Sequence, residues 1–229
     1  MENDFGALTQ ALAAHALNTR RFDRAVDLFE ESAEFEIQQD REDRAAAPYH
    51  QLGMIAAEQR DFEAAEKWYR KSLEINERLG DEHGAASTYH QLGIIAQEQR
   101  DFEAAEKWYR KSLEIKERLG DEHGAAITYH QLGIIAEEQR DFEAAEKWYR
   151  KSLEIKERLD NEHGAAMSLG QLGLLAEVQE DFAQAEKCLD LALLLFGRLN
   201  APAMVEQTER NLARIAKLKE QKTGDDTEE

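Results

Sequence analysis

The chain contains a 40-residue block that it repeats almost letter for letter. Residues 81–120 and 121–160 differ at only three of their forty positions, and looser copies flank the pair on both sides. The three differences are Ser87 against Ile127, Gln97 against Glu137, and Gly120 against Asp160. A fixed period of roughly 20–50 residues indicates units that bury their apolar faces against their neighbours, because one unit alone cannot enclose a core. The sequence therefore predicts a repeat protein.

Each block contains two stretches with the apolar spacing of a helix. Apolar residues recur there every three or four positions, which places each set on one helix face. Asp101 can cap the second helix by accepting a hydrogen bond from a free amide, and Gly120 can adopt the left-handed conformation that ends it. Gly93 lies inside the first helix, where glycine costs about 1 kcal/mol relative to alanine. Its recurrence in the other blocks predicts a close approach of the two helices, with Ala105 as the facing residue.

The order of residue types in the block is also specific. It runs Leu-Gly, an aromatic residue, alanine, a large aromatic residue and a small residue. The residues in question are Leu92, Gly93, Phe102, Ala105, Tyr109 and Ser112. This order resembles the tetratricopeptide repeat, although the period is 40 residues instead of about 34 and Glu117 stands where the family has proline. The longer form is similar to the repeats of kinesin light chain and of the arrays in bacterial signal-transduction ATPases. The resemblance implies an all-α fold, a right-handed α-solenoid of helical hairpins.

We expect a single solenoid over residues 1–218, made of five helical-hairpin repeats and a C-terminal capping helix. The repeats are expected at about 1–40, 41–80, 81–120, 121–160 and 161–200. The capping helix is expected at 201–218, because this stretch repeats the first-helix pattern and can cover the leucine-rich stretch from Leu189 to Phe196. Residues 219–229 are rich in charged residues, threonine and glycine, and we expect a disordered acidic tail there.

The charge balance narrows the range of partners. The chain has 48 acidic and 29 basic residues, a net charge of −19, which repels nucleic-acid phosphates and anionic membranes. No apolar run approaches the ~20 residues of a membrane span, and the first residues lack the basic and apolar parts of a signal peptide. We therefore expect a cytoplasmic protein whose partners are neither nucleic acids nor membranes.

The sequence lacks the common motifs of enzymes. It has no glycine-rich phosphate loop, no His-Glu-x-x-His and no Gly-x-Ser-x-Gly. His50, His90 and His130 recur once per repeat, but packed helices lie roughly 8–10 Å apart, whereas zinc needs its nitrogens about 2.1 Å from one ion. We therefore predict no enzymatic activity and no catalytic, metal-binding or cofactor-binding residues.

The family resemblance implies that the first helices line a concave groove. The predicted groove residues are His50, Gln51, Met54, Glu58, His90, Gln91, Ile94, Gln97, Glu98, His130, Gln131, Ile134, Glu137, Glu138, Gln171, Leu174 and Glu177. The last helix carries Arg210, Asn211 and Arg214 at the equivalent positions, where they could dock a carboxylate or the acidic groove of a second copy. Such a groove, with an acidic rim and a modest apolar floor, suits an extended peptide with basic residues.

Three functions remain open at this stage. The first is a non-catalytic scaffold that binds a protein or peptide in the groove. The second is a structural repeat protein, natural or consensus-designed, that self-associates through its end repeats, for example as a homo-oligomer through the C-terminal repeat. The third is the sensor module of a larger signalling system. Exposure of Leu189–Phe196 would favour self-association, and burial of this stretch would favour peptide binding.

Overall fold

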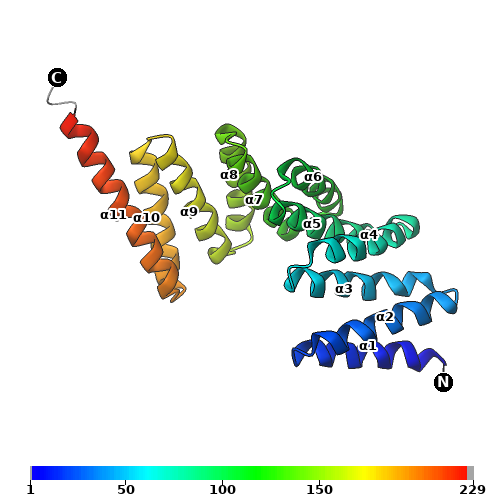
Figure 1. The fold of residues 1–229 in the computed structure, drawn as a ribbon. Helices are drawn as coiled ribbons and strands as arrows, with labels where there is room; N and C mark the ends of the chain where they lie inside the picture. The colour runs from blue at the N-terminus through cyan, green and yellow to red at the C-terminus, as the bar shows by residue number, and fades with distance from the viewer. Residues whose placement is uncertain (1, 226–229) are drawn as a thin grey trace. The chain divides into compact units, whose positions relative to one another are not determined.

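The computed structural model describes residues 2–225, and all regular secondary structure in that range is helical (Figure 1). The chain forms two compact units, Met1–Leu119 (unit one) and Gly120–Glu229 (unit two). Unit one contains α1 (Glu2–Asn18), α2 (Phe22–Gln38), the 3-10 helix η1 (Glu42–Ala45), α3 (Ala46–Glu58), α4 (Phe62–Leu79), α5 (Glu82–Glu98) and α6 (Phe102–Leu119). Unit two contains α7 (Glu122–Glu138), α8 (Phe142–Arg158), α9 (Glu162–Val178), α10 (Phe182–Arg198) and α11 (Pro202–Asp225). The first ten α-helices pair as five antiparallel hairpins, which confirms the predicted all-α solenoid class.

The helix boundaries follow from capping residues and left-handed turns. The carboxylate of Asp101 accepts a hydrogen bond from the backbone amide of Ala104 at 3.0 Å, as predicted. The equivalent caps are Asp61, Asp81, Asp121, Asp141, Asn161 and Asp181. Gly120 has the predicted left-handed conformation, with φ of 70°. Inside the first four hairpins an arginine has this conformation instead, for example Arg100 with φ of 61°, and Glu180 has it in the fifth; neither was predicted from the sequence.

In repeats two to four, the recurring glycine of the first helix packs against a tyrosine of the second helix, and in repeat five Gly173 packs against Leu189 instead. A Cβ atom added to Gly93 would lie 2.6 Å from both Cδ1 and Cε1 of Tyr109. This confirms the close approach, with the ring of Tyr109 as the nearest contact of Gly93; at Gly173, the backbone oxygen of Ala185, the counterpart of the predicted Ala105, is among the three nearest atoms. The ring occupies the space that the missing side chain leaves, and Tyr109 is completely buried there.

Helix α11 closes the apolar core of unit two. Its Ile215 is completely buried and packs in one cluster with Leu189 of α10. Phe196 is buried as well, but Leu191 and Leu194 are 44% and 61% exposed. The helix therefore covers one side of the leucine-rich stretch and leaves the other side open.

Helix α11 extends beyond its predicted end at residue 218. It continues to Asp225, so residues 219–225 are helical where we predicted a disordered tail, and residues 226–229 lie outside the described range. Two ion pairs connect these additional turns to the preceding hairpin, from Lys219 to Glu186 at 2.8 Å and from Lys222 to Glu180 at 2.5 Å. The composition of this stretch did not reveal those long-range partners.

Candidate functional site

The first helices of repeats two to five carry no lysine and no arginine. In α3, α5, α7 and α9 every charged residue apart from histidine is a glutamate. The second helices hold the basic residues, such as Lys71, whose ammonium lies 4.9 Å from the ring centre of Tyr49 and 4.5 Å from that of Trp68. We call the predicted groove residues of α3 and α5 the first-helix face of unit one, and those of α7 and α9 the first-helix face of unit two. Both faces are acidic.

The three groove histidines are held by packing contacts. His50 lies edge-on to Tyr69 with ring centres 5.2 Å apart, and its Nδ1 is 3.3 Å from the hydroxyl of Thr88. His90 and His130 pack in the same way on the tyrosines of their own repeats, at 5.3 and 5.4 Å. Burial, together with a nearby lysine, lowers the pKa of each of these two imidazoles to about 4. The histidines are therefore half-buried neutral groups at pH 7 and add no positive charge to the faces.

Two further groove residues accept hydrogen bonds from buried tyrosines. The hydroxyl of Tyr109 donates to Gln97 at 2.8 Å, and that of Tyr149 donates to Glu137 at 2.9 Å. Gln97 and Glu137 are thus partly engaged within their own repeats. The sequence analysis missed this role, because the tyrosine lies twelve residues further along, on the opposite helix. The sequence did contain a signal for this role, because a tyrosine follows the polar groove residue by twelve positions in both repeats.

The other groove residues remain accessible in different degrees. In unit one, Met54 is 43% exposed and Glu58 is exposed, whereas Gln51, Gln91 and Ile94 are half-buried. Glu98 is exposed and lies 3.5 Å from Arg60. In unit two the exposed member is Glu138, and the half-buried members are Gln131, Ile134, Gln171 and Leu174. Each face thus keeps polar and apolar atoms available to a ligand.

The basic residues of α11 are engaged within the chain. Arg214 makes two charge-assisted hydrogen bonds to Glu177, at 2.6 and 2.7 Å. Arg210 pairs with Glu206 on its own helix, and Asn211 is 7% exposed and accepts a hydrogen bond from Gln207. The Glu177 carboxylate is therefore paired with α11 in this structure, and Arg214 docks a carboxylate of its own chain.

We expect the Arg214–Glu177 pair to contribute little to stability despite its two hydrogen bonds. The arginine side chain is 52% exposed, and exposed pairs typically contribute about 0.2–1 kcal/mol. A double-mutant cycle of Arg214→Gln and Glu177→Gln, followed by urea unfolding, should give a coupling energy below ~1 kcal/mol. A coupling energy of several kcal/mol would show that the pair, and not the apolar contact of Ile215, fastens α11.

A buried lysine lies between the helices of repeats four and five. Lys156 of α8 is 6% exposed, and its ammonium donates a hydrogen bond to Ser168 of α9 at 3.0 Å. The hydroxyl of Ser168 lies 3.5 Å from Nδ1 of His130 and 3.4 Å from the hydroxyl of Ser152. Burial lowers the pKa of Lys156 to about 8. No carboxylate of the described residues pairs with this ammonium.

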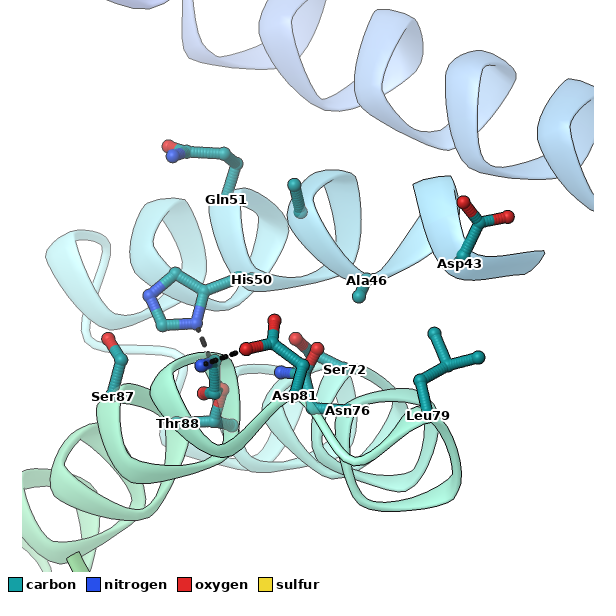
Figure 2. Close-up of a pocket in the computed structure, with 12 residues that line it drawn as sticks. Asp43, Ala46, His50, Gln51, Ser72, Asn76, Leu79, Asp81, Ser87 and Thr88 are labelled. Atoms are coloured by element: carbon teal, nitrogen blue, oxygen red, sulfur yellow. Dashed lines mark hydrogen bonds between the residues drawn. The ribbon is translucent and has the colours of Figure 1, made fainter. Parts of the chain in front are cut away.

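Unit one contains a cavity of about 300 Å³ between α3, α4 and α5. Figure 2 shows its lining, in which His50 and Thr88 are joined by the hydrogen bond described above. Ser72 and Asn76 also line it, and Asp43 and Asp81 are exposed lining residues. The sequence analysis did not predict this cavity. The sequence contained one signal for it: repeat two has the shorter Asn76 at the position where the next two repeats have lysine.

Among the described residues, no three histidine, cysteine, aspartate or glutamate side chains gather in a way that could hold a metal ion. No helix in the described part of the chain has the length and apolar character needed to cross a membrane.

The fold is similar to that of several solved proteins. BtubC (BKLC) from P. vanneervenii is 25% identical, with a TM-score of 0.74 over 86% of this chain and 81% of that chain. A signal transduction ATPase with numerous domains and a tetratricopeptide repeat sensor, from Pyrococcus horikoshii, is 18% identical, with a TM-score of 0.79 over 92% of this chain but 32% of its own. A putative kinesin light chain from Podosopora anserina, with nearly identical repeats, is 15% identical, with a TM-score of 0.70 over 85% of this chain and 96% of that chain.

Sequence comparison gives the family. A search of curated protein sequences found no match. The family model described as tetratricopeptide repeat matches residues 5–78, 43–118 and 84–158. These overlapping matches cover the first four hairpins and extend over more than half of the 229 residues. The chain therefore belongs to the tetratricopeptide repeat family.

Proposed function

We propose that this protein is a non-catalytic scaffold whose first-helix faces hold an extended, basic segment of a partner protein. Tetratricopeptide repeats generally bind proteins or peptides. The observation that carries the basic character of the partner is the absence of lysine and arginine from α3, α5, α7 and α9, all of which carry glutamates. A surface of one charge attracts a segment of the opposite charge and disfavours wrong partners.

The groove residues supply contacts suited to a peptide chain. The amides of Gln51 and Gln91 can donate to and accept from a peptide backbone. Met54 and Ile94 offer apolar surface between them, and methionine adapts its shape to different side chains. The expected location is the cytoplasm, where a lone thiol such as that of Cys188 stays reduced.

The proposal is tested by reversing charge on one face. We expect Glu58→Lys with Glu98→Lys to weaken the binding of a fluorescent lysine-rich peptide by about tenfold or more, because like charges then oppose each other. The affinity is measured by fluorescence anisotropy of the full chain at low salt and again at ~0.5 M salt, where screening shortens the Debye length.

The matched control places the same charge change on the second helices. Glu74→Lys with Glu114→Lys alters exposed residues of α4 and α6 by the same total charge. We expect this control to change the affinity by less than about threefold. If both variants lose the same affinity, the peptide does not bind specifically at the first-helix face. The binding would then reflect only attraction to the net charge of −19.

A second candidate function is self-association through α10. The exposed Leu191 and Leu194 favour it, because the equivalent residues of repeat four are Lys151 and Glu154. Under this candidate, the solution mass measured by light scattering rises above 26.2 kDa with concentration. The variant Leu191→Lys with Leu194→Glu should then restore a constant mass. A constant mass for the unchanged chain would exclude the candidate.

A further inference from the structure

The cavity of unit one contains buried polar groups without partners. Ser72 is 1% exposed and Asn76 is 5% exposed, and neither side chain has a hydrogen-bond partner among the described residues. Buried polar groups in proteins are nearly always hydrogen-bonded. In the next repeat, Ser112 does have a partner, since it donates to the carbonyl of Ala86 at 2.8 Å. The polar atoms of Ser72 and Asn76 are not among the fully enclosed unpaired atoms of the described residues, so they remain accessible from the cavity and available to a ligand.

The chain itself shows which chemistry fits this space. Position 76 is occupied by Lys116 in repeat three and by Lys156 in repeat four. In unit two, Cδ of Lys156 lies beside Gly164, and at the equivalent glycine of unit one, Gly84, the side-chain amide of Asn76 takes this place. Its ammonium donates to Ser168, the equivalent of Thr88. Asparagine ends at this point, so repeat two leaves open the space that the last carbon and the ammonium of a lysine would take.

We propose that this cavity binds the side chain of a lysine from a partner protein, whose ammonium takes the place that the Lys156 ammonium has in unit two. This deepens the proposed function and rests on it. The ammonium donates to Thr88 as Lys156 donates to Ser168, and the amide oxygen of Asn76 and the hydroxyl of Ser72 accept the remaining hydrogens. A volume of about 300 Å³ is roughly ten times the share of one water molecule and holds a four-carbon chain.

The charges around the cavity favour a cation over an anion. Asp43 and Asp81 lie among its lining residues, and no lysine or arginine does. The amino-terminal end of α5 also faces this region, and a helix terminus of this kind attracts anions. Here the carboxylate of Asp81 already accepts a hydrogen bond from the amide of Gly84 at 3.0 Å, so this end is capped.

The experiment titrates the full chain with short peptides and observes the side-chain amide of Asn76 by NMR. The probe is an acetylated and amidated peptide with one lysine between alanines and serines. Its partner has norleucine, which keeps the four-carbon chain and lacks the charge. We expect the lysine peptide to shift the Asn76 signals and the norleucine peptide to bind at least about tenfold more weakly. Equal binding of the two peptides would overturn the proposal.

Butylamine, the lysine side chain alone, should bind more weakly than the lysine peptide. Equal affinity of butylamine and the peptide would overturn the proposal and indicate a site for small amines instead.

Three variants test whether the space itself matters, with the Thr88 methyl signal as the probe. Asn76→Lys reproduces repeats three and four, and Asn76→Met fills the cavity without a charge. Both should reduce the affinity for the lysine peptide by about tenfold or more, whereas Ser87→Ala, at an exposed lining residue that the proposed ligand contacts do not use, should stay within about threefold. Unchanged affinity in the two filled variants would overturn the lysine site. The proposed function is contradicted by a different result. It fails if the charge reversals Glu58→Lys and Glu98→Lys leave the affinity for the long lysine-rich peptide unchanged.

Discussion

Replacing Gly133 by alanine lowers the stability of unit two, against the usual effect of this substitution in a helix. Alanine normally stabilises a helix interior by about 1 kcal/mol relative to glycine. At Gly133, however, the new Cβ would lie 2.5 Å from Cε1 and 2.6 Å from Cδ1 of Tyr149. Tyr149 is completely buried and its ring cannot move aside freely. Overpacking of this kind costs about 1–3 kcal/mol and outweighs the helix gain, so we expect a net loss of up to roughly 2 kcal/mol in urea unfolding.

Gly170 provides the matched control within the same unit. It lies in α9, one helix away from the Gly133–Tyr149 contact along the chain, and a Cβ added there meets no atom within 4 Å. We expect Gly170→Ala to stabilise the protein by about 0.5–1 kcal/mol, because only the backbone effect remains. If Gly133→Ala stabilises the chain by the same amount, then the close packing on Tyr149 is not a constraint on this repeat.

Replacing Lys156 by methionine changes the pH dependence of stability. Burial lowers the pKa of Lys156 from its ordinary value of 10.5 to about 8. Between these two pH values the unfolded chain binds a proton that the folded chain has released, so stability rises with pH across this window. The folded protein therefore carries a penalty below pH 8 that disappears towards pH 10.5. At about 1.36 kcal/mol per pKa unit, the free energy of unfolding of the unchanged chain should gain roughly 2–3 kcal/mol relative to the methionine variant over this window.

The measurement is urea unfolding of both proteins at intervals from pH 7 to pH 10. The groups that face Lys156 are Ser152, Ser168 and His130, and the imidazole stays neutral throughout because its pKa is about 4. Lys151 of the same helix is exposed, so Lys151→Met serves as the control and should follow the unchanged chain at every pH. Parallel curves for Lys156→Met and the unchanged chain would mean that this ammonium remains hydrated in the folded protein.

The sequence by itself determined the repeat, the hairpins and their boundaries. These features depend on residues close together in the chain. Apolar residues around Leu92 recur at helical spacing, Asp101 accepts a hydrogen bond from the amide of a residue three positions later, and Gly120 adopts a left-handed conformation. The position of Gly93 also predicted close helix packing, although only the structure showed that the nearest residue is Tyr109. Local chemistry of this kind acts within one or two helix turns, and a periodic sequence repeats it visibly.

The tertiary structure alone decided which groove residues are available to a ligand. Gln97 accepts from a tyrosine twelve residues away, Glu177 binds an arginine thirty-seven residues away, and His50 contacts a threonine thirty-eight residues away. The cavity at Asn76 likewise depends on three helices at once. Near-identical repeats place near-identical side chains in a row, but burial, hydrogen bonding and empty space depend on the neighbouring repeat. Single differences such as Asn76 against Lys156 therefore change the local surface without changing the fold.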